Sequence, residues 1–354
     1  MEEFEISVRP YKDADYKEVL KLVRDVWGLR DEALIRKTWD WFFRDNPFRP
    51  PEAPYCLVLE KNKELIGIHF YIYLNLKLQK ETRISRWGAH LISHPKHRGE
   101  IARLFRGSLR LPYYPFIGSS STGIADFLHK VTKWSGLIIG TIYYRKSVLE
   151  MKQFLRDKLK NKFISIFFGG IYNFIFANYL RIIKHPGLTV SRISIFDDKF
   201  DGLWQDASRD YSILVVRDKD YLNWRFINTP IEYRVYSSVK EGKLSGYIVL
   251  KVEEVDNVIK GKVAELFVKS DDTASAEALL LEAMRYFIQC KCVTAECLMH
   301  SSKKSYQSSL TKLGFFIKRA QKKFIGYAQD KVLSEEIGDF NSWFISAADP
   351  DVEL

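Results

Sequence analysis

The chain contains one short motif twice, at positions 183 residues apart. Trp41-Phe42-Phe43-Arg44-Asp45-Asn46-Pro47 and Trp224-Arg225-Phe226-Ile227-Asn228-Thr229-Pro230 share the pattern W-x-F-x-x-x-P. This period is far longer than the roughly 20–50 residues of a solenoid repeat. It predicts two copies of one domain-sized fold, and the 354 residues are enough for two hydrophobic cores.

The residues around each motif predict the same order of elements. Ala33–Arg44 is expected to form a helix that ends at Asn46-Pro47, because the residue before a proline is disfavoured in the α region. Strand-like apolar runs follow each motif, at Tyr55–Glu60 and Leu65–Leu74 in the first half and at Tyr233–Ser238 and Ser245–Val252 in the second. A strand and a helix come next, at Gly88–Ser93 and Ile101–Leu111, and again at Val263–Val268 and Ala276–Ile288. We therefore expect an α/β (α+β) fold with a mixed sheet in each half.

The segment between the halves has an unusual composition. It is rich in Lys and Arg up to Lys162, and 163–180 then carries no charged residue. Three interpretations are open: an apolar connecting helix packed against the domains, a membrane-surface helix with basic flanks, or a membrane span. We expect a first domain at 1–150, a helical connector at 151–190 with possible peripheral membrane contact through 151–184, and a second domain at 191–354.

The charge balance favours anionic partners. The chain has 55 Lys and Arg against 44 Asp and Glu, a formal net charge of +11. Phosphorylated cofactors, nucleotide-linked sugars and acidic membrane surfaces fit such a surplus. The basic residues are scattered, so a nucleic acid partner is not expected. The four cysteines form no C-x-x-C pair and the first residues lack an apolar run, so we expect free thiols and a cytoplasmic location.

The order of predicted elements resembles that of the GNAT (GCN5-related N-acetyltransferase) superfamily in both halves. The segment Asp218-Lys219-Asp220-Tyr221-Leu222-Asn223-Trp224-Arg225-Phe226 is similar to one in two-domain GNAT-like proteins associated with surface-polysaccharide chemistry. The resemblance implies two tandem acyl-CoA N-acyltransferase-like domains. It further implies acetyl-CoA, or another acyl-CoA, as co-substrate and a small-molecule amine or amino sugar as acceptor.

The resemblance places the coenzyme A phosphates on the stretch after the fourth strand of the first half. Backbone N–H groups and a helix N-terminus bind such phosphates. The residues implied are Leu91, Ile92, Ser93, Arg98, Gly99, Glu100, Ile101 and Ala102. The usual second glycine is absent, and Glu100 adds a negative charge. The equivalent stretch of the second half lacks the arginine and glycines, and Asp271 or Asp272 is expected to cap a helix there.

The catalytic candidates also follow from the resemblance. A base on the fourth strand would be His90 or its counterpart Glu265, and Tyr306 would be the acid, because Leu310 occupies the usual tyrosine position before Gly314-Phe315. No carboxylate or cysteine completes a metal site with His90, so no metal is expected. Two alternatives remain open: a catalytically degenerate binding or scaffold protein, and an aminoacyl-tRNA-dependent transferase.

Overall fold

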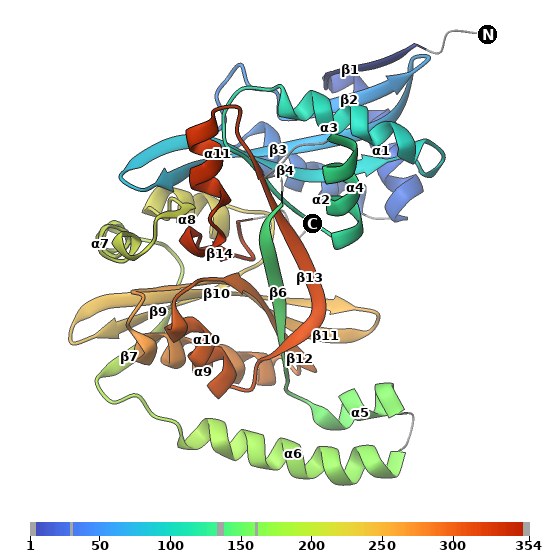
Figure 1. Ribbon diagram of the computed structural model, residues 1–354. Helices are drawn as coiled ribbons and strands as arrows, with labels where there is room; N and C mark the ends of the chain where they lie inside the picture. Colours follow the sequence, from blue (N-terminus) through green and yellow to red (C-terminus); the bar gives the residue numbers. More distant parts are fainter. Residues whose placement is uncertain (1–4, 29–30, 133–137, 160–161, 350–354) are drawn as a thin grey trace. The chain divides into compact units, whose positions relative to one another are not determined.

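The computed structural model describes residues 5–28, 31–132, 138–159 and 162–349 (Figure 1). The chain divides into two compact units. The first unit consists of Met1–Thr141, Lys322–Ser342 and Asp349–Leu354, and the second of Ile142–Gln321 and Trp343–Ala348. Both units have the mixed α/β structure expected from the sequence.

The first unit is built on a sheet with the strand order β1-β2-β3-β4-β5-β13. The strands are β1 (Ile6–Pro10), β2 (Cys56–Lys61), β3 (Glu64–Leu78), β4 (Glu81–Ser93), β5 (Phe116–Ser120) and the end of β13 (Phe316–Tyr327). Neighbours are antiparallel except β4 and β5, which are parallel. Strand β3 is buried along most of its length, so its apolar run forms the centre of this unit.

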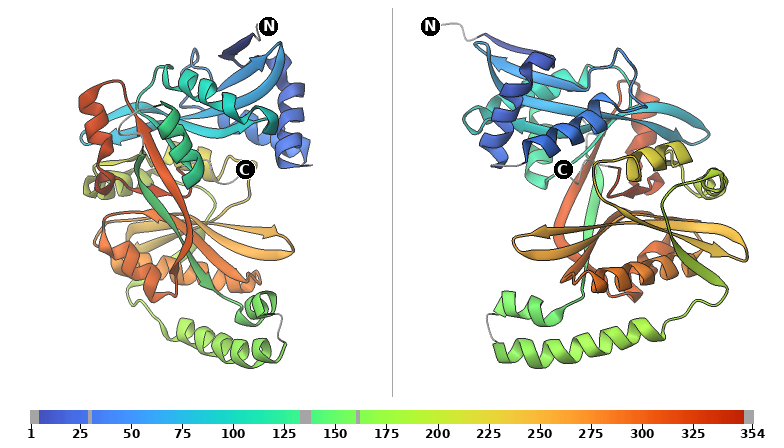
Figure 2. Two further views of the ribbon diagram at one scale, coloured as in Figure 1. Left: turned by 45° about the vertical axis from the view of Figure 1, so that its right-hand side comes forward. Right: turned by 180° about the vertical axis from the view of Figure 1, so that it is seen from behind.

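Helices cover both faces of this sheet. They are α1 (Tyr16–Trp27), α2 (Glu32–Trp39), α3 (Ile101–Leu109), α4 (Thr122–Thr132) and α11 (Lys331–Gly338). Helices α1 and α2 lie in front of the sheet in the rear view of Figure 2, and α3 lies in front in Figure 1. Helix α1 buries Val19, Leu22 and Val23, which share one helical face, and α3 buries Leu104, Phe105 and Leu109.

The helix expected at Ala33–Arg44 is interrupted. An α-helix ends at Trp39, and Asp40–Arg44 continues as one π-helical segment, with the Asp45 N–H donating to the Asp40 carbonyl at 2.7 Å. Phe42 and Phe43 of this segment are both buried. Phe43 stacks on Phe70 of β3 with ring centroids 4.6 Å apart.

The second unit repeats the same topology, with the strand order β7-β9-β10-β11-β12-β6. The strands are β7 (Leu188–Ile193), β9 (Arg234–Lys240), β10 (Lys243–Val255), β11 (Val258–Val268), β12 (Thr294–His300) and the end of β6 (Ile138–Val148), with the short β8 (Ile213–Val215) and β14 (Ile345–Ser346) outside this order. Again one neighbouring pair, β11 and β12, is parallel and the others are antiparallel.

Helices of the second unit are α5 (Met151–Leu159), α6 (Lys162–Ile182), α7 (Asp198–Ala207), α8 (Lys219–Phe226), α9 (Thr273–Gln289) and α10 (Lys304–Lys312). Helix α9 covers one face of β9–β11, and α7 and α8 cover the other (Figure 2). The repeated tryptophans occupy equivalent places: Trp41 lies in the π-helical segment before β2, and Trp224 lies in α8 before β9.

The last strand of each sheet comes from the other half of the sequence. Strand β6 follows the first half but pairs with β12, and β13 follows the second half but pairs with β5. Because of this exchange, Lys322–Ser342 belongs to the first unit although it follows most of the second in sequence. The boundary lies at Thr141, and residues 142–190 belong to the second unit.

Candidate functional site

A slot opens in the first unit where the parallel strands β4 and β5 stop pairing. Their register runs from Arg86 opposite Phe116 to Gly88 opposite Gly118. Beyond this point both strands line a pocket of about 250 Å³, with Ala89, His90 and Leu91 from β4 and Ser119 and Ser120 from β5. All residues that line this pocket belong to the first unit.

Gly88 lets the two strands and the neighbouring side chains approach closely. A Cβ at this position would lie 2.8 Å from Cζ of Phe116 and 2.9 Å from Nε2 of His69. A larger residue would therefore displace a side chain from the wall of the slot.

A β-bulge lies at the mouth of the slot. Ile68 of β3 pairs with Ile92, and Phe70 pairs with Ala89, so His90 and Leu91 together face the single residue His69. His90 has a φ of 45°, in the left-handed region that is uncommon for a residue with a side chain. A bulge turns backbone groups away from the ladder, which makes them available to a ligand. The predicted residue His90 thus lines the pocket at a point of local backbone distortion.

A second pocket, of about 610 Å³, adjoins the first because both are lined by Leu91 and Ile124. Its wall contains most of the residues predicted to bind coenzyme A, namely Leu91, Ile92, Ser93, Arg98, Gly99 and Ile101. The opposite wall is α4, which contributes Gly123, Ile124 and Phe127. The two adjoining pockets are together called the groove; their lining residues run from the start of α3 to the β4–β5 slot.

The turn before α3 at one end of this groove is a 3-10 helix, Pro95–Glu100, that leads directly into the helix. Arg98 and Gly99 are exposed, and a Cβ on Gly99 would meet no atom within 4 Å. The turn thus has open space beside a cation and the N-terminal end of α3, which is the environment that phosphate groups prefer.

The two other residues predicted in this stretch have different roles. Nε of Arg103 lies 2.9 Å from Oε2 of Glu100, so the negative charge that the sequence places beside the expected phosphates has a cationic partner. Ala102, the second residue of α3, is buried and does not line the groove. Its small side chain lets the first turn of α3 pack closely on the sheet.

His69 also lines the slot, and the sequence analysis did not identify it. The buried Ser108 hydroxyl donates to the Leu104 carbonyl at 3.0 Å and contacts Nδ1 of His69 at 2.7 Å and the Tyr71 hydroxyl at 2.6 Å. Because the one hydroxyl proton of Ser108 is used on Leu104, Nδ1 carries the proton of the imidazole. Nε2, on the side of Gly88, is then the hydrogen-bond acceptor. A histidine within the otherwise apolar run of β3 is the sequence signal that could have revealed it.

Burial keeps His69 neutral. Loss of hydration, followed by the charges of Arg86 and His90, lowers the pKa of His69 from 6.5 to about 3. A neutral imidazole with a fixed tautomer can orient a donor group in the slot, and its proton on Nδ1 is held by Ser108.

This low pKa makes a prediction about stability. The unfolded chain takes up a proton at His69 near pH 6.5 while the folded chain does not until about pH 3, so the free energy of unfolding falls as the pH drops between these values. At pH 5 the expected loss is about 2 kcal/mol relative to pH 8. We expect His69→Asn to show a smaller difference between urea unfolding at pH 8 and pH 5. An identical pH dependence in both proteins would contradict the neutral buried imidazole.

The second unit has the equivalent strand separation, but the chain itself fills it. The parallel pairing of β11 and β12 ends at Val263 opposite Cys297, and β14 then pairs with β12. The Ala348 N–H donates to the Ala264 carbonyl at 3.0 Å. Trp343 and Phe344 are buried beside this contact, so residues 343–348 occupy the position that corresponds to the slot of the first unit.

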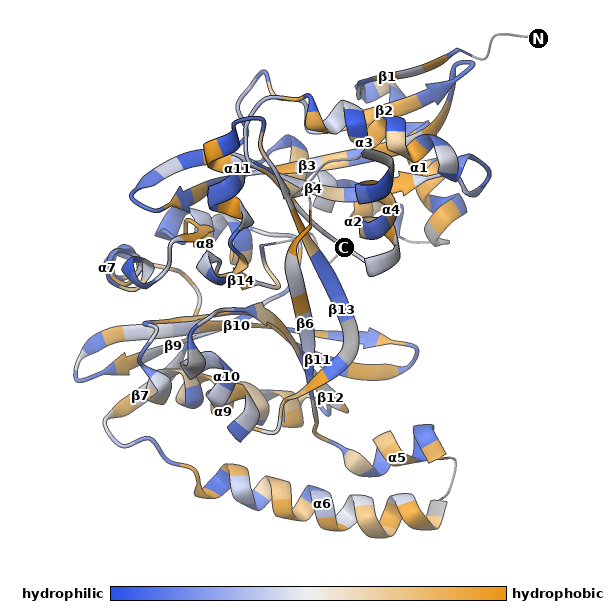
Figure 3. Ribbon diagram, viewed as in Figure 1, coloured by the Kyte–Doolittle hydropathy of each residue, from blue (hydrophilic) through white to orange (hydrophobic). Residues whose placement is uncertain are grey.

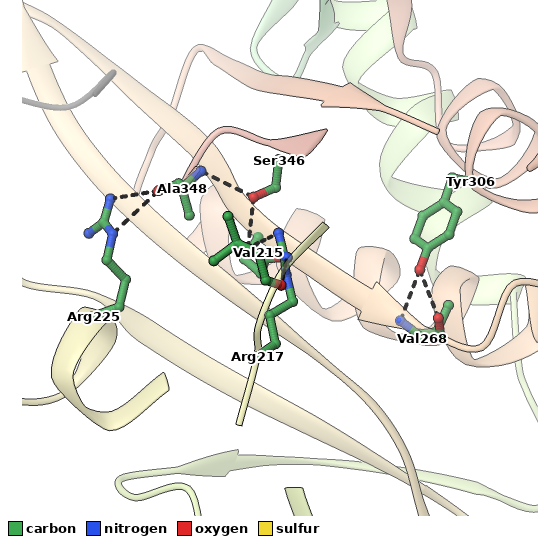
Figure 4. Close-up of polar contacts among 8 residues, drawn as sticks. Val215, Arg217, Arg225, Val268, Tyr306, Ser346 and Ala348 are labelled. Carbon is green, nitrogen blue, oxygen red and sulfur yellow. Dashed lines mark hydrogen bonds and ion pairs between the residues drawn. The ribbon is translucent and has the colours of Figure 1, made fainter. Parts of the chain in front are cut away.

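Glu265 and Tyr306 lie inside the core of the second unit. Glu265 is fully buried, at 2.9 Å from Nε of Arg217, and it accepts a hydrogen bond from the Ser346 hydroxyl at 2.7 Å. The Tyr306 hydroxyl donates to the Val268 carbonyl at 2.8 Å and accepts from its N–H at 3.0 Å (Figure 4). Burial raises the pKa of Tyr306 well above its usual value. Neither residue is among those that line the pocket of His90.

The helix cap predicted at the start of α9 is present in the structure. Asp272 caps α9 through a hydrogen bond from the Ser275 N–H at 3.1 Å, as expected for a helix cap. Among the residues that the structure describes, no group of three or more His, Cys, Asp or Glu side chains could hold a metal ion.

Comparison with known proteins identifies the fold. No family model and no curated protein matches the sequence. The solved structures that match include Saccharomyces cerevisiae N-myristoyltransferase with bound myristoyl-CoA, at a TM-score of 0.57 and 11% identity over 92% of this chain and 83% of that one. They also include GCN5-related N-acetyltransferases from Anabaena variabilis (TM-score 0.59, 11% identity, 91% and 72% covered) and Kribbella flavida (TM-score 0.56, 14% identity, 91% and 71% covered). The chain thus has the GNAT fold that its sequence resembles.

Proposed function

We propose that the chain is an acyl-CoA-dependent N-acyltransferase whose co-substrate binds the first unit. The observation that carries this proposal is the pair of adjoining pockets lined from the Arg98–Gly99 turn to the β4–β5 slot. The phosphates of coenzyme A would meet Arg98 and the first turn of α3. The pantetheine arm would follow Leu91–Ser93 and α4, and the thioester would lie at the bulge near His90.

The proposed reaction transfers the acyl group from sulfur to nitrogen. The amine attacks the thioester carbonyl, the C–N bond forms, the C–S bond breaks, and the proton lost by the amine ends on the thiol of coenzyme A. His90 would accept the amine proton, directly or through water, and backbone N–H groups at the bulge would stabilise the developing oxyanion. His69 would accept a hydrogen bond from a donor group in the slot.

The proposal also names a class of acceptor and an acyl group. We propose an amino group on a small molecule or sugar connected with surface polysaccharides, and acetyl as the acyl group, in a cytoplasmic enzyme. Two features support a single co-substrate site per chain: residues 343–348 fill the equivalent separation in the second unit, and Asp272 caps the equivalent helix.

Isothermal titration of acetyl-CoA into the protein and into Arg98→Glu tests the proposal. A charge-assisted contact to phosphate contributes about 1.5–3 kcal/mol, so we expect the variant to bind at least tenfold more weakly. Arg110→Glu is the matched control, since Arg110 is exposed just past the other end of α3 and its substitution changes the net charge equally. No binding to the folded wild-type protein would contradict the proposal and favour the scaffold alternative. Equal loss in both variants would contradict the assignment of the phosphates to Arg98.

A further inference from the structure

Helix α6 is long, apolar and mostly exposed. The segment Phe163–Ile182 has a mean hydropathy of 1.5, and only 22% of its most apolar window is buried. Figure 3 shows the apolar colouring along α6. A core helix of this composition would be buried on most sides. Packing of an apolar connector against the domains therefore does not account for the exposed outer face of α6.

The inner side of α6 is the small and polar side. A Cβ on Gly169 would lie 2.6 Å from Cα of Lys152 in α5, so the two helices are in close contact there. Asn173 accepts a hydrogen bond from the Met151 N–H at 2.8 Å and donates to Glu150 at 2.6 Å. Ser165 is fully buried on the same side.

Further contacts fix α6 to the rest of the second unit. The Tyr172 hydroxyl donates to the Val148 carbonyl at 3.1 Å, and the Tyr179 hydroxyl donates to the Lys312 carbonyl at 2.9 Å. Phe176 and Leu180 are buried. These contacts hold one side of the helix against the protein along its length.

The outer side of α6 carries large apolar side chains. Phe163 and Phe174 are 76% and 71% exposed, and Phe167 lies between them at helical spacing. The exposed apolar residues of this surface are Phe163, Ile166, Phe167, Phe168, Ile171, Phe174, Ile175 and Ile182. Burying one such side chain is worth about 1.5–3 kcal/mol, so a surface of this size indicates a binding partner.

Basic residues precede and follow this apolar segment in the sequence. In residues 151–184 the charged side chains are Lys152, Arg156, Lys158, Lys160, Lys162, Arg181 and Lys184, against the single acid Asp157. Lys152, Arg156 and Lys158 are exposed on α5, and Arg181 and Lys184 are exposed at the end of α6 and just after it. A Phe- and Ile-rich face between basic flanks matches the acyl region and anionic headgroups of a bilayer.

We propose that α6 binds the surface of an anionic lipid bilayer, with the helix axis in the membrane plane and its exposed apolar face inserted. The contacts through Tyr172, Asn173 and Tyr179 favour this arrangement over a span, because a spanning helix would have to leave them. The proposal is independent of the acyltransferase function.

Co-sedimentation with lipid vesicles tests this proposal. We expect the wild-type protein to pellet with vesicles of phosphatidylcholine and phosphatidylglycerol, and to pellet less as salt is added. The double substitution Phe167→Ser with Phe174→Ser should weaken the association at least tenfold. The matched control is Ile195→Ser with Val332→Ser, which removes two exposed apolar side chains away from α6 and should leave the association unchanged.

Four results would overturn the proposal. The first is no pelleting of the wild-type protein at low salt, and the second is equal pelleting of the Phe167/Phe174 variant. The third is a wild-type protein that does not bind vesicles but forms a dimer by light scattering, where the dimer dissociates in the Phe167/Phe174 variant. A second copy of the chain would then cover α6. The fourth is vesicle-bound protein that resists alkaline carbonate extraction, which indicates a span.

Discussion

Arg217→Met should lower the free energy of unfolding of the second unit by about 3–5 kcal/mol, because it leaves the carboxylate of Glu265 buried without its cation. Both side chains have no solvent exposure, and Nε of Arg217 lies 2.9 Å from Oε1 of Glu265. Arg217 also donates to the Val215 carbonyl at 2.6 Å (Figure 4). Its guanidinium lies 4.9 Å from the ring centroid of Phe344. Urea unfolding at neutral pH measures the loss.

The double variant Arg217→Met with Glu265→Leu is the control for this experiment. It removes both charges, and replacing a buried ion pair with apolar residues is often close to neutral, so we expect it to recover most of the stability. A double variant as unstable as the single one would show that packing of Arg217, and not the unpaired carboxylate, sets the loss.

The same double variant separates two roles for Glu265. If Glu265 only belongs to the ion pair that holds residues 343–348, its replacement leaves turnover unchanged once the fold is restored. If Glu265 is the catalytic base predicted from its alignment with His90, its replacement removes turnover. Turnover near the wild-type level in the stable double variant would therefore assign Glu265 a structural role, and its loss would support the sequence prediction.

The sequence was sufficient for the parts of the fold that depend on local pattern. Apolar runs predicted the strands around Leu65–Leu74 and Ser245–Val252, and the repeated tryptophan motif predicted two copies of one topology. The interruption of the helix at Trp39 was not predictable, because it depends on how Phe42 and Phe43 pack against β3.

The exchanged strands and the filled separation in the second unit depend on contacts between distant parts of the sequence. Nothing local to β6 or β13 indicates which sheet each strand joins. Residues 343–348 form only a two-residue strand, β14, so no periodicity marks them. Glu265 aligns with His90, yet its environment is set by Arg217 and Ser346, which are far from it in the chain.

The candidate site likewise combines residues that local sequence predicts with residues whose role depends on contacts made only in the folded chain. The Arg98–Gly99 turn could be found from the sequence because the residues that bind phosphate are consecutive. His69 could not be assigned, because its tautomer depends on Ser108, on a helix 39 residues later. Its accepting nitrogen, Nε2, can meet a ligand only because β4 and β5 separate beside it. This separation exists only in the folded sheet.

Gly123→Trp should abolish most co-substrate binding while leaving the protein folded. Gly123 is the second residue of α4 and lines the larger pocket, and a Cβ there would meet no atom within 4 Å. Glycine is also the poorest helix former after proline, so the substitution should not destabilise α4. An indole at this position would fill the part of the groove assigned to the pantetheine arm. We expect affinity for acetyl-CoA to fall at least tenfold, about 1.4 kcal/mol, by isothermal titration.

Gly202→Trp is the matched control for this change. Gly202 lies in α7 of the second unit, and a Cβ there also meets no atom within 4 Å. The two variants therefore differ in whether the new side chain enters the groove, and Gly123→Ala tests whether its size matters. Weak binding in Gly123→Trp, with normal binding in Gly202→Trp and Gly123→Ala and unchanged melting temperatures, would place the ligand between β4 and α4. Normal binding in Gly123→Trp would contradict that placement even if the protein binds coenzyme A, because the groove could not then hold the pantetheine arm.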